Sequence, residues 1–276
     1  MHKLSIRKGW IPVLLLAVLL IAGIAVSIAG SDSAVWPDPS GEDVQSSGKL
    51  VVDCSHMDQG YVMARVSEPT SHAMKLRVTF GGGQLMYDLN SEGEYESIPL
   101  QLGSGTYEFS LFENVSGSKF SAEGKVTLAV ELADENAAYL APNQYVNYDP
   151  ESVTVQKSDE ICAGKTTARE CYDAVCDFIT SEFSYDFVRA KTISSGTLPE
   201  VDPCFEKRSG ICQDMAAVMV CMLRVQGIPA KLVIGYADQY YHAWTVAVVD
   251  GQEIFFDPTA AIGAMNAKNY AVERMH

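Results

Sequence analysis

Basic residues are scarce in this sequence. Its 20 lysines and arginines stand against 35 aspartates and glutamates, which gives a net charge of −15 at pH 7. Proteins that bind nucleic acid present a basic face to the phosphates, and phosphate contacts supply much of their affinity. The acidic balance therefore removes nucleic acid from the expected partners. With 276 residues, 47% of them hydrophobic, the chain can bury one full core or two modest ones.

Cysteine and histidine do not occur at metal-binding spacing. The seven cysteines include no Cys-x-x-Cys pair, and the five histidines do not fall at ligand spacing with them. This argues against a structural zinc site, so no metal or cofactor is expected. An odd number of cysteines leaves at least one without a disulfide partner. For Cys54, Cys162 and Cys204 the sequence leaves open whether each is paired or free.

The N-terminus carries a long apolar run. Residues 10–29 contain no charged side chain, and three basic residues precede them. About 20 apolar residues are needed to cross a bilayer core, and a basic flank stays in the cytoplasm. We expect residues 1–30 to be a signal anchor, with the C-terminal body outside the cell membrane. The alternative is a signal peptide cleaved near residue 29, which would make the protein secreted.

Two segments of different character follow. Residues 31–48 are rich in Ser, Pro and Asp, which predicts a flexible stalk. Over residues 49–133 apolar and polar side chains alternate, most clearly at 74–80, 107–111 and 126–132. Glycine-rich turn sequences separate these runs. The pattern predicts a small all-β sandwich of immunoglobulin-like type.

The remaining part, residues 134–276, mixes helical and strand patterns. Thr167 and Glu170 form a capping box before a helix. Cys171 and Cys176 fall on different faces of that helix, so we expect both to be core residues that do not bridge each other. A second helix is expected from about Cys212 to residue 226. The runs 230–237, 242–250 and 253–257 predict strands, the last two forming a hairpin through Asp-Gly. The fold class is therefore α+β, with helices packed on an antiparallel sheet.

Three residues of this part predict a thiol active site. Cys212 opens the second helix directly after a Ser-Gly turn, where the helix dipole favours thiolate over thiol. His242 and Asp257 lie at corresponding ends of the predicted hairpin strands. A carboxylate there can accept from one imidazole nitrogen and direct the other toward sulfur. We therefore expect Cys212 to be the nucleophile, His242 the general base and acid, and Asp257 its orienting partner.

The same residues carry a family resemblance. Gly-x-Cys-x-Asp-x-Ala occurs at 210–216, His-Ala-Trp at 242–244 and Asp-Pro-Thr at 257–259. In this pattern the chain resembles the transglutaminase-like superfamily, in its secreted or membrane-anchored Gram-positive form, over about residues 140–262. The resemblance implies a papain-like core with a Cys-His-Asp triad. Members include protein-crosslinking acyltransferases, peptidases, amidases and proteins without catalysis. No calcium-binding loop occurs, so a calcium-regulated animal-type enzyme is not suggested.

Four further residues have weaker expected roles. Tyr185 is a candidate second contact for an oxyanion, beside the backbone N–H of Cys212. Asp214 is expected to stabilise the helix dipole, with a role in the site as the alternative. Trp244 is expected to pack in the core rather than to touch substrate. Gln213 stands where many crosslinking members carry an aromatic residue, which weakens the case for crosslinking.

The expected function is that of an extracytoplasmic thiol enzyme acting on peptide or amide bonds through a cysteinyl acyl intermediate. Water would release the acyl group in a peptidase or amidase, and an amine would do so in protein crosslinking. The substrate would be a protein or peptide, with cell-wall-associated polypeptides as one option. The alternative is a non-catalytic cell-surface binding or assembly protein. The oligomeric state is left open.

Overall fold

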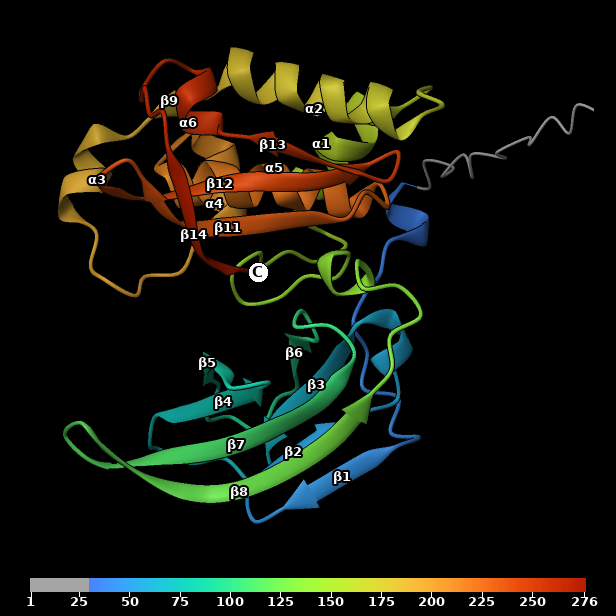
Figure 1. The fold of residues 1–276 in the computed structure, drawn as a ribbon, viewed down its shortest axis with the longest axis vertical. Coiled ribbons are helices and arrows are strands. Elements are labelled where there is room, and N and C mark those ends of the chain that lie inside the picture. The colour runs from blue at the N-terminus through green and yellow to red at the C-terminus, as the bar shows by residue number, and fades with distance from the viewer. Residues whose placement is uncertain (1–29) are drawn as a thin grey trace, which may run out of the picture.

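The computed structural model describes residues 30–276, which form two units (Figure 1). The first is a β-sandwich and the second combines helices with a four-stranded sheet. The C-terminal end of the chain lies between the two units (Figure 1), where Gln101 of the sandwich donates a hydrogen bond to the Met275 carbonyl. The α+β class and the preceding β region predicted from the sequence are confirmed.

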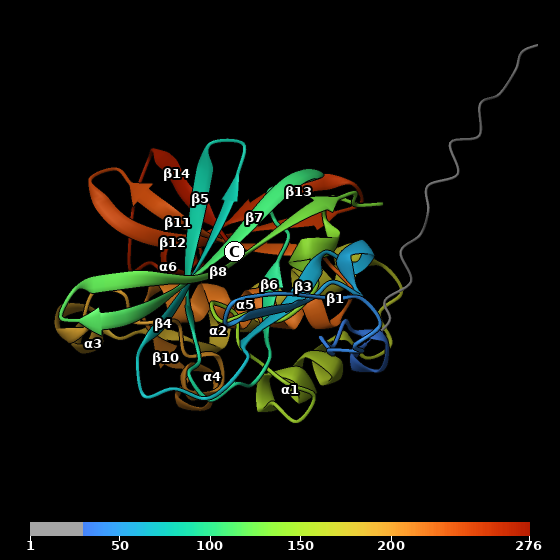
Figure 2. The same ribbon diagram turned by 90° about the horizontal axis from the view of Figure 1, so that it is seen from below.

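The sandwich consists of two antiparallel four-stranded sheets. Figure 2 shows the molecule from below Figure 1, with the sandwich toward the viewer. The strand order is β1-β2-β3-β6 in one sheet and β5-β4-β7-β8 in the other. In β4 the side chains of Met74, Leu76 and Val78 are buried while Lys75 and Arg77 are only half-buried, as the alternation predicted. The strands are β1 (Val44–Ser47), β2 (Leu50–Asp53), β3 (Tyr61–Val66), β4 (Met74–Phe80), β5 (Gly83–Leu89), β6 (Glu96–Pro99), β7 (Gly105–Ser116) and β8 (Lys119–Val130).

Residues 31–48 were predicted to be a flexible stalk, and this prediction is corrected by the structure. The segment is held at both of its ends. Ser31 opens a short 3-10 turn (Ser31–Ser33), and its backbone N–H donates to Asp159 at 3.0 Å. The Trp36 ring packs edge-on against Tyr148, with centroids 5.8 Å apart. Val44–Ser47 then pairs with β2. Composition suggested a stalk because Ser, Pro and Asp dominate, but Trp36 supplies an apolar contact that composition alone does not weigh.

The C-terminal unit packs α5 (Cys212–Val225) on the sheet β13-β12-β11-β14, and α1 (Val153–Cys162) and α2 (Ala168–Glu182) pack against α5. The Asp250-Gly251 turn has positive φ at both residues, 53° and 75°, and joins β12 to β13 in the register that pairs Val249 with Gln252, as predicted. The larger elements are α1 (Val153–Cys162), α2 (Ala168–Glu182), α5 (Cys212–Val225), β11 (Ala230–Ala237), β12 (Tyr240–Val249), β13 (Gln252–Phe256) and β14 (Tyr270–Met275). The smaller ones are β9 (Ser184–Tyr185), α3 (Phe187–Thr192), α4 (Val201–Lys207), β10 (Ser209–Gly210) and α6 (Pro258–Ala261).

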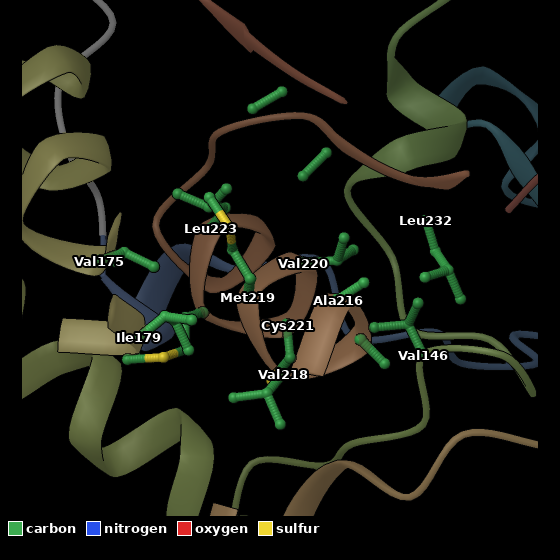
Figure 3. Close-up of a cluster of buried hydrophobic side chains, with 14 of the residues drawn as sticks. Val146, Val175, Ile179, Ala216, Val218, Met219, Val220, Cys221, Leu223 and Leu232 are labelled. Atoms are coloured by element: carbon green, nitrogen blue, oxygen red, sulfur yellow. The ribbon is translucent and has the colours of Figure 1, made fainter. Parts of the chain in front are cut away.

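Helix α5 is the centre of this unit. Every residue from Asp214 to Val225 is buried, so the helix has no solvent face. Figure 3 shows side chains of other segments, such as Val146, Val175 and Leu232, surrounding it. A helix that is apolar all round is a central one packed on several sides. The position of Cys212, at the start of α5, is thereby fixed by the core of the unit.

A disulfide joins Cys162, the last residue of α1, to Cys171 in the first turn of α2, with Cα atoms 5.1 Å apart. The expectation that Cys171 is an unpaired core residue is therefore wrong, although it is fully buried. Cys176 is free and half-buried, and it does not bridge Cys171, as predicted. The capping box that starts α2 is also present, with Glu170 N–H donating to the Thr167 hydroxyl at 3.2 Å. The turn between α1 and α2 brings the two sulfurs together, and helical periodicity within α2 gives no signal of that.

Arg224 is the largest buried cation of the described residues, and its side chain has no exposed area. Its guanidinium donates to the carbonyls of Ala141 at 2.7 Å, Ala230 at 2.9 Å and His276 at 3.0 Å. Burial lowers the pKa of this side chain from its ordinary value. One side chain thus joins α5 to the segment after the sandwich, to β11 and to the last residue of the chain.

Across residues 30–276, no helix combines the length and the apolar character needed to cross a membrane. The apolar run predicted as a signal anchor or signal peptide falls at residues 10–29, outside the described residues.

Candidate active site

Cys212 is the first residue of α5 and is half-exposed. The short strand β10 leads into it and pairs in parallel with β9, so that Gly210 lies opposite Tyr185. A side chain at Gly210 would place its Cβ 2.5 Å from the Cys204 sulfur and 2.9 Å from Asp214 Cβ. Only glycine therefore allows β10 to pass this close to the start of the helix, which fixes the nucleophile candidate relative to β9.

His242 lies near the start of β12, opposite Gly235 of β11, and only 2% of its side chain is exposed. Its Nε2 is 2.9 Å from Oδ2 of Asp257. The Cys212 side chain is also close enough to the imidazole to raise its pKa. Because Nε2 belongs to the carboxylate, Nδ1 is the nitrogen left for the sulfur. The three residues predicted from separate motifs are therefore brought together, although β12 begins two residues earlier than expected.

Asp257 follows β13 and is the N-cap of α6. Its Oδ1 accepts the backbone N–H groups of Thr259 at 2.9 Å and Ala260 at 3.2 Å. Its Oδ2 accepts from His242 and from the Tyr270 hydroxyl, the latter at 2.8 Å. Burial raises the pKa of this carboxyl, but the hydrogen bonds and the neighbouring imidazole outweigh burial and hold the pKa below its ordinary value. The group is thus a fixed carboxylate at neutral pH.

The environment of His242 favours its charged form. Burial lowers the pKa of the imidazole, but the hydrogen bonds to Asp257 and Cys212 raise it more, to about 9 from an ordinary 6.5. A proton on this ring is therefore retained at neutral pH, between a carboxylate and a thiol. Such an arrangement can hold a thiolate–imidazolium pair and can later return the proton to a leaving group.

Tyr185 lies at the end of β9, and its hydroxyl is close enough to the backbone N–H of Cys212 for that group to lower the pKa of the phenol in part. Its ring packs edge-on against Phe187, with centroids 4.9 Å apart. Burial raises the pKa of the phenol to about 12, so the hydroxyl keeps its proton at neutral pH. The structure places Tyr185 beside the first turn of α5, and its role as an oxyanion contact stays a prediction.

Asp214 and Gln213 both bind neighbouring segments. Asp214 is 1% exposed, accepts the Ile211 and Glu200 backbone N–H groups at 3.2 Å each, and pairs with Arg189 at 3.0 Å. Gln213 donates from Nε2 to the Thr197 carbonyl at 3.0 Å. The two side chains after Cys212 thus hold the segment 197–200 against the start of α5. Their contacts are those of positioning residues.

Trp244 is buried to 99% beside the site rather than in it. Its ring lies edge-on to Tyr270 with centroids 5.2 Å apart, and 6.3 Å from the His242 ring. Tyr270 itself was missed by sequence reasoning. It lies on β14, which pairs with β11 across more than 30 residues of sequence, and nothing local in "NYAVERM" points to Asp257. Tyr270 and Trp244 together close one side of the His242–Asp257 pair.

The other free cysteines lie in environments that suppress the thiolate. Burial raises the pKa of Cys54 to about 12 and that of Cys176 to about 11, and it also raises the pKa of Cys204 and Cys221. Cys212 is the free cysteine that combines partial exposure, a helix N-terminus and an imidazole. For residues 30–276 no group of three or more Cys, His, Asp or Glu side chains is arranged to hold a metal ion.

Comparisons with known proteins agree with the motifs. Residues 155–258 match the model of the transglutaminase-like superfamily. No curated protein matched the chain in sequence. Solved structures that resemble it include a candidate cysteine protease from Cytophaga hutchinsonii (16% identity, 85% of this chain and 90% of that one, TM-score 0.39). The others are the periplasmic domain of TgpA from Pseudomonas aeruginosa bound to ethylmercury (18%, 82% and 78%, 0.37) and red sea bream transglutaminase (12%, 72% and 48%, 0.32).

The assignment to a family rests on the match to the family model and on the order of the three motifs within it. The matched residues run from α1 to the start of α6 and contain Cys212, His242 and Asp257. Within the C-terminal unit, residues 155–258 form a domain that matches the transglutaminase-like superfamily.

Proposed function

We propose that this protein is an extracytoplasmic thiol enzyme that acts on peptide or amide bonds through an acyl group carried on Cys212. The observation that supports this most is the sharing of the His242 imidazole between Asp257 and Cys212 at a half-exposed helix N-terminus. The extracytoplasmic location is supported by the Cys162–Cys171 disulfide, since disulfides persist mainly in oxidising compartments.

In the proposed first step, the Cys212 thiolate attacks the carbonyl carbon of the substrate. The carbonyl oxygen takes the negative charge, and the C–N bond then breaks. The imidazolium of His242 gives its proton to the leaving amine, so the products are a thioester and a neutral amine or ammonia. Asp257 keeps the ring in place and stabilises its charged form during this cycle.

In the second step, the neutral His242 takes a proton from water or from an amine as that nucleophile attacks the thioester. The C–S bond breaks, and the thiolate–imidazolium pair is restored. Water gives a carboxylic acid, which is hydrolysis, and a lysine-type amine gives a crosslink. Both outcomes use the same acyl intermediate, so the acceptor is decided by which nucleophile reaches the thioester.

Iodoacetamide labelling near neutral pH tests the nucleophile. We expect Cys212 to be alkylated at least about 10-fold faster than free cysteine, since a thiolate and not a thiol is the reacting species. The buried Cys204 and Cys221 serve as internal controls and should stay unmodified in the folded protein. Labelling of Cys212 no faster than free cysteine, together with an unchanged rate in His242→Ala, would contradict the proposal.

The reaction itself is distinguished by mass spectrometry of a glutamine-containing peptide library, with and without an added amine. Cleavage adds a water and splits the peptide, deamidation replaces an amide nitrogen by oxygen, and crosslinking releases ammonia. Cys212→Ala is the matched control. Products of none of these types, with the wild-type protein still labelled at Cys212, would favour the non-catalytic surface protein instead.

Tyr185→Phe is expected to lower kcat by about 10- to 100-fold. The Tyr185 hydroxyl lies beside the Cys212 N–H and keeps its proton at neutral pH, so it can donate that proton to an oxyanion that develops there. Phenylalanine keeps the ring packing on Phe187 but removes this donor. The measurement is kcat together with the alkylation rate of Cys212, which should not change. Tyr240→Phe, at an exposed tyrosine of β12, is the control. An unchanged or higher kcat in Tyr185→Phe would show that the hydroxyl does not stabilise the oxyanion.

A further inference from the structure

A cleft of about 470 Å³ lies where the two units meet. We call it the inter-unit cleft. The sandwich contributes Tyr95, Glu96 and Ser97, and the segment between the units contributes residues such as Asn143, Tyr148 and Asp149. Trp36 closes it from the N-terminal segment, and Leu198 from the segment before α4. The cleft therefore exists only because both units and the segment 31–48 are packed together.

Two polar atoms in its lining have no hydrogen-bond partner among residues 30–276. They are Nδ2 of Asn143 and Oγ of Ser97, and both atoms are buried. Asn143 is 5% exposed, and its Oδ1 accepts the backbone N–H groups of Tyr145 at 2.9 Å and Val146 at 3.1 Å. These two bonds fix the orientation of the amide and leave Nδ2 as an unused donor. A buried donor without a partner costs about 1–3 kcal/mol, so this part of the lining is not fully satisfied by contacts within residues 30–276.

The walls have the composition of a site for extended polypeptide. The rings of Trp36, Tyr95 and Tyr148 stand beside three prolines, Pro37, Pro142 and Pro150. The Trp36 ring is held edge-on to Tyr148, and its Nε1 donates to the Ser31 carbonyl at 3.1 Å. Grooves with rigid aromatic walls bind extended, proline-containing peptides, because such peptides lose little entropy on binding.

The charge of the lining favours a basic peptide. Glu96 and Asp149 line the inter-unit cleft, and no lysine or arginine does. Arg65 stacks on the Tyr95 ring at 5.0 Å, but its guanidinium donates to the carbonyls of Val66 and Ser67. Glu96 accepts from the Asn90 side chain at 2.7 Å and so is held in place. Two carboxylates beside aromatic faces are complementary to an ammonium or guanidinium group.

The inter-unit cleft is connected to the candidate active site through the segment 197–200. Leu198 lines the cleft. Its neighbours Thr197 and Glu200 are bonded to Gln213 and Asp214, the two residues that follow Cys212. A polypeptide in the cleft would thus lie against the same short segment that borders the start of α5.

We propose that the inter-unit cleft is an exosite that holds an extended, lysine- or arginine-containing segment of the polypeptide substrate. The inference rests on the proposed function and adds the class of substrate to it. The site that recognises the substrate is in this view separate from the site that reacts with it, and both units of the chain contribute to it.

Fluorescence anisotropy with the full chain carrying Cys212→Ala tests the binding without turnover. The probe is a fluorescein-labelled peptide of alternating lysine and proline, and its analogue has glutamate for lysine. We expect the lysine peptide to bind and the glutamate peptide not to bind. Glu96→Gln combined with Asp149→Asn keeps the acceptor oxygens but removes both charges, and should weaken binding by about 5-fold or more. Asp177→Asn with Glu182→Gln, two exposed residues of α2, removes equal charge elsewhere and is the control.

Each result decides one of the two proposals. Equal binding of both peptides, or equal weakening by both double variants, overturns the exosite. The kcat/KM for a basic peptide can also be compared between the wild-type enzyme and the Glu96→Gln, Asp149→Asn variant, both with Cys212 intact. Equal values overturn the exosite and leave the proposed function standing. Binding as expected without any product from the wild-type protein contradicts the proposed function, and leaves the ligand chemistry of the inter-unit cleft standing.

Discussion

Replacing His242 by alanine is expected to lower kcat/KM by about 10³-fold or more, while the fold is retained. The imidazole contacts both Cys212 and Asp257. Without it the thiol loses its base and the leaving group loses its acid. The measurement is kcat/KM on a substrate found in the peptide library, with thermal unfolding as a check of folding. A loss of less than about 10-fold would show that the reaction does not pass through this residue.

The pH profile gives the same prediction a second readout. The pKa of His242 is about 9, so above that pH the ring loses the proton that the leaving group requires. We expect kcat/KM to fall above about pH 9, with an apparent pKa that belongs to the Cys212–His242 pair. Alkylation of Cys212 should not fall there, because the attack on iodoacetamide needs no proton from His242. The proton on His242 also stabilises the fold: this contribution is complete below pH 6.5 and is lost as the pH rises through about 9.

Asp257→Asn is the matched control for this assignment. Asparagine keeps an oxygen for the Thr259 and Ala260 N–H groups, so α6 stays capped, but it removes the charge beside the imidazole. The alkaline limb of kcat/KM should therefore move to lower pH, and the rate should drop by about 10²-fold or more. An alkaline limb that stays near pH 9 in Asp257→Asn would mean that another group controls it.

Replacing Arg224 by methionine is expected to lower the free energy of unfolding by about 3 kcal/mol, the largest effect on stability that we expect from one side chain. Methionine fills part of the space, but three buried carbonyls, those of Ala141, Ala230 and His276, lose their donor. Methionine also removes the cost of burying a charge, which offsets part of the lost stability. The expected decrease in the free energy of unfolding is therefore smaller than the sum of the costs of three buried carbonyls without a donor. Urea unfolding followed by circular dichroism measures the change.

Arg169→Met is the control for that experiment. Arg169 forms an exposed ion pair with Asp173 one helical turn away, and its side chain is 55% exposed. Its removal should change the free energy of unfolding by about 0.5 kcal/mol or less. Equal urea midpoints for Arg224→Met and the unmodified protein would show that the three carbonyls find other donors. The free energy of unfolding falls linearly with urea concentration. A lower slope of this line in Arg224→Met, but not in Arg169→Met, would show that the two units unfold separately once the Arg224 side chain is gone.

The parts of the structure that were predictable are those whose signal is local. The Asp-Gly turn alone sets the register of β12 and β13, and with it the approach of Asp257 to His242. Glycine before Cys212 marks the entry to α5, where the close approach to Cys204 requires it. Alternation revealed the strands of the sandwich because one face of each is buried.

The parts that were missed depend on contacts between distant segments. Tyr270 reaches Asp257 only because β14 returns to pair with β11. The Cys162–Cys171 disulfide depends on the turn between two helices. The role of Asp214 in holding the segment before α5 depends on its ion pair with Arg189 of α3. Trp36 gains its partner from residues more than 100 positions later in the sequence. None of these pairings has a periodicity or a local motif, so each follows from the assembled fold.

The contact of Ser31 with Asp159 sets how far this molecule can reach. A flexible segment over 31–48 would have let the body move up to roughly 60 Å from the point where the chain leaves its proposed anchor. Ser31 is instead bonded to α1 of the C-terminal unit by its backbone and its hydroxyl. If residues 10–29 are the anchor expected from the sequence, the tether would have almost no slack, and the unit that carries Cys212 would travel with the bilayer. Its encounters with substrate would then be a search in the plane of the membrane, limited to polypeptides that come to the surface themselves.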